Sequence, residues 1–225
     1  MRFIKKNRPM LKAITPFCKG NTVKMLLFGF LVGFLQNGFC VLIAILHKDI
    51  YIKFDSFNVI QIILLLIAVF IQSSAEELIC RGFLYQRLRR GYKNPMIAVI
   101  GNAVLFSLLH ILNSGVTVLA LINICLVGLF YSLMVYYCDS IWFPMAAHCA
   151  WNFTQNIIFG LPNSGIVTPL SIYKLDASTA TDSFAYNVEF GVEGTIVAAV
   201  LLGICCIAVY LWGSKNNRKP TEIWT

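Results

Sequence analysis

Charged side chains are scarce in this chain. Only 12% of its 225 residues are Asp, Glu, Lys or Arg, and 58% are hydrophobic. Soluble domains carry about 25% charged residues, so this composition excludes an ordinary water-soluble fold. It favours an integral membrane protein.

Charge is absent altogether from several long stretches. A helix needs about 20 apolar residues to cross the hydrocarbon core, so these stretches predict six membrane-spanning helices. We therefore expect an all-α bundle that forms one membrane domain over residues 1–225, without internal repeats. The predicted spans are 25–46, 57–75, 96–112, 116–138, 143–160 and 192–213.

The basic residues are clustered. Fifteen of the eighteen lie in the segments 1–24, 81–93 and 215–219. Cytoplasmic loops retain positive charge, so both termini are predicted to be cytoplasmic and the polar segment 161–193 to be an external, mobile loop. Topology and contact with anionic membrane lipids explain the net charge of +8, and we expect no nucleic-acid partner. No A-x-A site follows the first apolar stretch, so we expect a retained helix and no cleavable signal peptide.

Histidine is rarer still, with only three residues, and no His-Glu-x-x-His is present. This excludes the helical zinc motif of soluble metalloproteases. The eight cysteines show neither metal-ligand spacing nor a disulfide framework. His47 is expected at a membrane interface, whereas His110 and His148 fall within predicted spans.

The first polar motif is Glu76-Glu77-Leu78-Ile79-Cys80-Arg81. Ionisable groups near the hydrocarbon are costly and are often functional. Glu77 and Arg81 are four residues apart and share a helical face, so we expect them to pair while Glu76 points elsewhere. Taken alone, the motif is equally typical of a helix end whose charges reach water.

Two further motifs are Phe106-Ser107-Leu108-Leu109-His110 and His148-Cys149-Ala150-Trp151-Asn152. His148 and Asn152 share one helical face. If one helix runs unbroken from about 58 to 90 and the next returns antiparallel, Glu76 and His110 each lie about 20–24 Å from the intervening turn. They would then face each other, with Ser107 on the same side.

These three motifs, in this order on separate hydrophobic helices, resemble the CPBP family. This family comprises the CAAX-protease and bacteriocin-processing (Abi) intramembrane proteases, and the matching core spans residues 57–160. The resemblance implies a membrane endopeptidase acting on a peptide or membrane-protein substrate. It assigns activation of water to Glu76 with help from His110, and binding of the water or the developing oxyanion to His148 and Asn152. The supporting residues are Glu77, Arg81 and Phe106.

The resemblance also implies zinc, because Glu76, His110 and His148 would form a three-ligand set of the kind that zinc uses. A metal-free glutamate mechanism would use the same residues. Because Glu76 and His148 lie near predicted cytoplasmic helix ends, we expect the site to open toward the cytoplasm. One alternative is a non-proteolytic bacteriocin-immunity or membrane regulatory protein. Another is a small transporter with an intramembrane proton relay, which the lack of inverted repeats disfavours.

Overall fold

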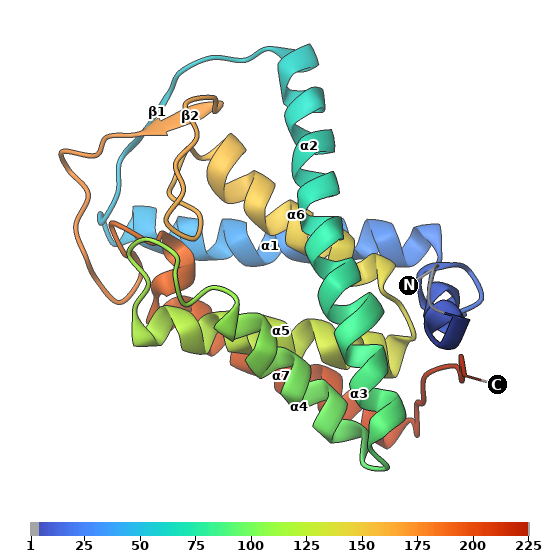
Figure 1. Cartoon of the computed structure of the whole chain (residues 1–225). Helices are drawn as coiled ribbons and strands as arrows, with labels where there is room; N and C mark the ends of the chain where they lie inside the picture. Colours follow the sequence, from blue (N-terminus) through green and yellow to red (C-terminus); the bar gives the residue numbers. More distant parts are fainter. Residues whose placement is uncertain (1–4, 225) are drawn as a thin grey trace.

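The computed structural model describes residues 5–224, and the predicted all-α membrane bundle is confirmed (Figure 1). Arg2, one of the basic residues predicted to be cytoplasmic, lies outside the described residues. The helices are α1 (Val23–Leu46), α2 (Val59–Glu77), α3 (Tyr85–Gly91), α4 (Pro95–Leu108), α5 (Val118–Cys138), α6 (Trp142–Phe153) and α7 (Ile196–Lys215). Two short strands, β1 (Ile52–Phe54) and β2 (Tyr173–Leu175), form an antiparallel ribbon.

The long helices begin at side chains that cap them. Thr22, Asn58, Thr117 and Thr195 each accept a hydrogen bond from the backbone N–H three residues further on. Such caps satisfy N–H groups that the first helical turn leaves without a partner. They explain why each apolar run begins its helix where it does.

Within residues 5–224, four helices are long and apolar enough to cross a membrane: α1, the continuous helix Val59–Gly91, α5 and α7. The span predicted at 96–112 forms the shorter apolar helix α4, which ends at Leu108. The span predicted at 143–160 forms α6 and a π-helical turn, Thr154–Ile158. Six crossings therefore remain a prediction.

The unbroken helix predicted from about 58 to 90 is confirmed. A π-helical turn, Leu78–Leu84, joins α2 to α3 without interruption. Such turns contain one extra residue per turn and are frequent at functional sites. This one follows directly after Glu76 and Glu77 and contains Arg81.

Helices α1 and α6 pack closely through two glycines. A Cβ atom added at Gly29 or Gly33 would collide with the backbone carbonyl oxygen of Phe143 or Ala147 on α6. The absence of side chains at these positions lets the two backbones approach, as in other small-xxx-small helix pairs. This contact fixes α6, and with it His148 and Asn152, against the rest of the bundle.

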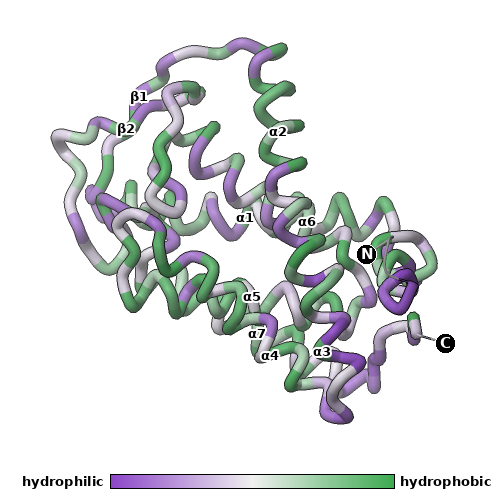
Figure 2. The backbone as a smooth tube through the Cα atoms, in the orientation of Figure 1, coloured by the Kyte–Doolittle hydropathy of each residue, from purple (hydrophilic) through white to green (hydrophobic). Residues whose placement is uncertain are grey.

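The bundle has two chemically different ends. At one end lie the described N-terminal segment, the α3–α4 turn and the C-terminal tail, where hydrophilic residues gather (Figure 2). Asp139 joins the N-terminal segment to the C-terminal tail, because it accepts hydrogen bonds from the backbone N–H groups of Lys19 and Thr221. We call this the basic end.

The opposite end contains the segment 161–193, which was expected to be an external, mobile loop. The structure folds it onto the bundle, where Leu161, Tyr186 and Phe190 are fully buried. It also contributes β2, which pairs with β1 (Figure 1). We call this the ribbon end, and its location outside the cell remains a prediction.

Candidate active site

A buried ion pair underlies the site. The Glu77 and Arg81 side chains are both fully buried, with an Arg81 Nη1 to Glu77 Oε1 distance of 2.8 Å. Arg81 also donates to the Gly128 carbonyl oxygen at 3.1 Å, and its guanidinium lies 4.3 Å from the centre of the Phe106 ring. The predicted pairing is confirmed. Each member of the pair gives the other a partner in an apolar interior, where a single charged side chain would be costly.

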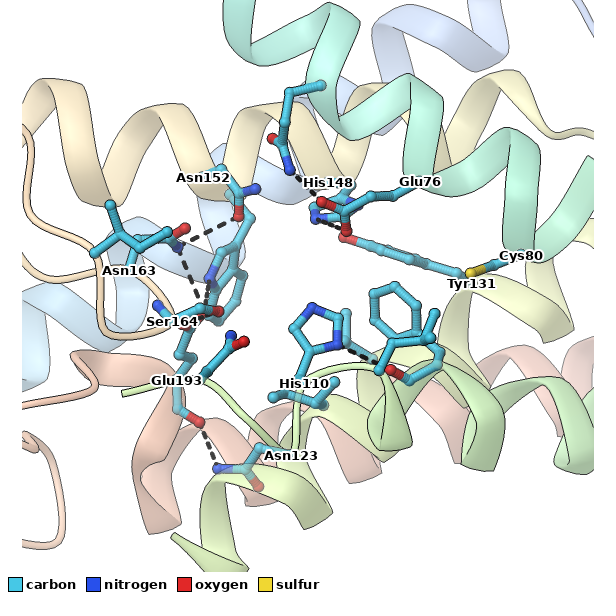
Figure 3. A pocket seen from close by; sticks show the side chains of 18 of the residues that line it. Glu76, Cys80, His110, Asn123, Tyr131, His148, Asn152, Asn163, Ser164 and Glu193 are labelled. Atoms are coloured by element: carbon cyan, nitrogen blue, oxygen red, sulfur yellow. Dashed lines mark hydrogen bonds and ion pairs between the residues drawn. The ribbon is translucent and has the colours of Figure 1, made fainter. Parts of the chain in front are cut away.

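Glu76 points away from this pair, as predicted, and into a cavity of about 500 Å³ (Figure 3). Its side chain is 34% exposed, and the amide of Gln72, one turn earlier, donates a hydrogen bond to it. Successive glutamates on one helix therefore have different surroundings. Glu77 is sealed in the bundle, whereas Glu76 is available to a molecule in the cavity.

His148 joins the two glutamates. Its Nδ1 lies 3.0 Å from Glu77 Oε1, and its Nε2 lies 3.9 Å from Glu76 Oε2. A carboxylate that pairs with Arg81 only accepts hydrogen bonds, so Nδ1 must carry the proton that is donated to Glu77. The contact fixes the orientation of the ring and directs Nε2 toward Glu76 and the cavity.

His110 approaches the cavity from the other side (Figure 3). The helix predicted to reach 112 ends at Leu108, so His110 lies in the following turn and not within the helix. Its Nδ1 lies 2.9 Å from the Phe106 carbonyl oxygen. That oxygen can only accept, so Nδ1 donates to it, and Nε2 of the neutral ring is left with a free lone pair.

Ser107 was expected on the same face as His110, but its hydroxyl donates to the Leu121 carbonyl oxygen on α5 at 2.7 Å. The ring of Phe106 packs 4.8 Å from His110 and 6.1 Å from His148, centre to centre. The apolar ring of Phe106 therefore packs against both histidines and against the Arg81 guanidinium.

Asn152 completes the predicted set, one turn after His148 on the cavity side of α6. Its Oδ1 accepts a hydrogen bond from Asn163 Nδ2 at 3.3 Å. Glu76, His110, His148 and Asn152 thus come from three segments that are distant in sequence and line one cavity.

Sequence reasoning missed the wall of the cavity at the ribbon end. Asn163, Ser164 and Glu193 line it, and Trp151 Nε1 donates to Glu193 at 3.1 Å. Glu193 ends the polar segment 161–193, which was predicted to be an external loop. Its position directly before the last apolar run was the only signal in the sequence that set it apart.

The resemblance implies a zinc site made of Glu76, His110 and His148. Within residues 5–224, no group of three His, Cys, Asp or Glu side chains is placed so that it could hold a metal ion. One nitrogen of His148 is bound to Glu77, and the other is 3.9 Å from the nearer Glu76 oxygen. The residues as arranged do not fit a three-ligand site, so no step below passes through a metal.

The expectation that the site opens toward the cytoplasm stays a prediction, and the structure shows which end of the bundle the cavity adjoins. Asn113, Ser164 and Ile166 belong to the cavity wall, and all three lie in loops at the ribbon end. Gly165 and Ser114 pack closely there, which joins the two loops. The cavity therefore adjoins the end opposite to the basic one.

Comparison with known proteins agrees with this geometry. Residues 58–154 match the family model described as type II CAAX prenyl endopeptidase Rce1-like. The chain is also 41% identical over 118 residues to the uncharacterized protein YyaK of Bacillus subtilis strain 168. That match covers 50% of this chain and 38% of YyaK, so the chain spans well under half of this relative. No solved structure matches. All three motifs lie within residues 58–154, and over this core the chain is similar to the Rce1-like type II CAAX prenyl endopeptidases of the CPBP family.

Proposed function

We propose that the protein is an intramembrane endopeptidase of the CAAX-protease type. The observation that carries the proposal is the convergence of four polar side chains on one cavity: Glu76, His110, His148 and Asn152. The buried Glu77–Arg81 pair fixes two of them, because Glu76 directly precedes Glu77 on α2 and His148 binds Glu77.

Glu76 is the general base in this proposal. It takes a proton from a water molecule, the water oxygen attacks the carbonyl carbon of the peptide bond, and a tetrahedral intermediate forms. Glu76 then returns the proton to the leaving amine as the C–N bond breaks. Positioned acid–base groups of this kind contribute about 10²- to 10⁴-fold to rate. The free lone pair of His110 Nε2 holds the attacking water on the side opposite to α6.

His148 and Asn152 serve the carbonyl oxygen. The Asn152 amide nitrogen donates to the oxyanion as negative charge develops. His148 Nε2 donates to the oxyanion when the ring has taken up a proton from solvent before the attack, whereas the neutral ring, protonated only at Nδ1, has no donor at Nε2. Its contact with Glu77 keeps the ring in place in both states.

The rest of the cavity suits an apolar substrate. Val69, Ile79, Leu109 and Ile166 contribute to its wall. The substrate is a peptide or membrane protein whose apolar part occupies this space, and prenylated C-terminal CAAX proteins are one candidate class.

The test compares peptide termini in membranes from cells that express the native chain or Glu76→Gln. The substitution removes the base and preserves size, so the variant should accumulate normally and lose cleavage. Termini found only with the native chain would support the proposal and identify the substrate. If no termini differ while a toxin-resistance or signalling phenotype survives the substitution, a binding or immunity role replaces it.

A chelator distinguishes the metal-free glutamate mechanism from a zinc-dependent one. Because no proposed step uses a metal, cleavage should continue after prolonged treatment with 1,10-phenanthroline. Loss of cleavage that added zinc restores would contradict the metal-free mechanism, although not the proteolysis.

A further inference from the structure

Asn163 contacts the site from outside the region that matches the family model. It lies in the turn after the π-helical end of α6, where it exchanges two backbone hydrogen bonds of 2.9 Å with Ile166. Its amide nitrogen lies 3.3 Å from Asn152 Oδ1 and 3.4 Å from Glu193 Oε2 (Figure 3). The mechanism above gives this side chain no role.

The contact selects one of two orientations of the Asn152 amide. The terminal torsion of Asn is broad and roughly two-fold, so oxygen and nitrogen can exchange places at little cost. Asn163 Nδ2 is a donor and can only be matched by the oxygen of Asn152. The Asn152 nitrogen is thereby turned toward the side of the cavity where His148 and Glu76 lie (Figure 3).

Asn163 is itself held by a half-buried carboxylate. Glu193 accepts hydrogen bonds from Trp151 Nε1, from Asn163 Nδ2 and from both the hydroxyl and the backbone N–H of Ser164. These four bonds use the hydrogen-bonding capacity of both carboxylate oxygens. Glu193 therefore has nothing left to offer a substrate, and it ties the 163–164 turn to α6 at the start of α7.

We propose that Asn163 is a positioning residue for cleavage, which presents the Asn152 amide N–H to the developing oxyanion. The inference rests on the proposed function and deepens it. An inverted Asn152 would direct its oxygen at the negative charge, so the loss should affect the transition state more than substrate binding.

The experiment uses the full chain in detergent and a quenched fluorescent farnesylated peptide ending in Cys-Val-Ile-Met. Asn163→Ala and Asn163→Leu, the latter close to Asn in size, both remove the donor. We expect kcat to fall about 5- to 10-fold, as for one lost hydrogen bond, with KM changed less than about twofold. Ser164→Ala is the matched control, because it removes a bond between the same turn and Glu193 without touching Asn152. It should lower kcat less than about twofold.

Native-like kcat in both Asn163 variants would overturn the inference. So would an equal loss in Ser164→Ala, which would indicate general loosening of the turn, or a rise in KM at unchanged kcat. Thermal unfolding of each variant identifies misfolding, and a loss confined to misfolded variants also counts against the inference. If the native chain does not cleave this peptide, the same variants are compared on a peptide that spans the cleavage site found in the membrane comparison. If neither the peptide nor the membranes show a cut that depends on Glu76, the proposed function is overturned, and the inference with it.

Discussion

Two glycines of α1, five residues apart, should respond in opposite directions to the same substitution. At Gly33, a new Cβ would lie 2.8 Å from the Ala150 Cβ and still closer to the Ala147 carbonyl oxygen. At Gly38, an added Cβ has no heavy atom within 4 Å. Gly33→Ala must therefore push α1 away from α6, whereas Gly38→Ala meets open space.

The magnitudes follow from two separate terms. Alanine in a helix interior is favoured over glycine by about 0.5–1 kcal/mol, and Gly38→Ala should gain that amount of unfolding free energy. Overpacking at a close contact costs typically about 1–3 kcal/mol. Because the clash at Gly33 is with backbone, its cost should lie in the upper half of that range, so Gly33→Ala should lose about 1–2.5 kcal/mol net, and Gly33→Leu more.

The assay is thermal or denaturant-induced unfolding of the purified chain in detergent, read by tryptophan fluorescence. Displacement of α6 also moves His148 and Asn152, so Gly33→Ala should lower cleavage as well as stability. Equal stabilisation by both alanine substitutions would refute the close α1–α6 packing. Equal destabilisation would refute the claim that Gly38 faces open space.

Two further predictions concern the charged and polar core. Arg81→Met leaves Glu77 buried without its partner and should lower the unfolding free energy by about 3–5 kcal/mol. Lys174→Met breaks the exposed pair with Asp55 and should lower it by at most about 1 kcal/mol. Similar losses in the two variants would show that burial of the Glu77–Arg81 pair does not matter. His110→Ala should lower kcat about 100-fold with an unchanged unfolding midpoint. Retained turnover in this variant would show that His110 has no role in catalysis.

The helical core was predictable because its signals are local. Uncharged runs mark helices wherever lipid is the solvent, and four-residue spacing places Glu77 with Arg81 and His148 with Asn152 on shared faces. The antiparallel turn between α3 and α4 then brings Glu76 and His110 to one cavity. Each step needs only helix geometry and the order of the motifs.

The ribbon-end wall was not predictable, because its contacts join residues distant in sequence. Asn163 reaches Asn152 across a turn, and Glu193 meets Trp151 from a segment 42 residues away. No periodicity marks such residues, and an isolated carboxylate in a polar segment is usually solvated. The end of α4 at Leu108 was also not predicted, because the sequence stays apolar beyond it to Leu112. The hydrogen bond from the His110 side chain to the Phe106 carbonyl oxygen, which is compatible with a turn, leaves no pattern in the sequence.

The side of the membrane that supplies the substrate can be determined from two reporter cysteines. Tyr92, in the turn at the basic end, is 52% exposed, and Ile166, in the cavity wall at the ribbon end, is 69% exposed. Of the eight native cysteines, only Cys125 and Cys205 are not buried, so labelling of the native chain should give a low background.

The charge distribution predicts that the basic end is cytoplasmic, and Ile166, at the opposite end, would then lie outside. A membrane-impermeant maleimide applied to intact cells should therefore label Ile166→Cys at once and Tyr92→Cys only after permeabilisation. The reverse pattern would mean that the basic end is external and that the cavity faces cytoplasmic substrates. Labelling of both reporters from one side would contradict the bundle itself, because α4 and α5 separate the two ends by the full length of a helix. Since each outcome fixes which compartment adjoins Glu76, this measurement also decides where the cleaved termini should be sought.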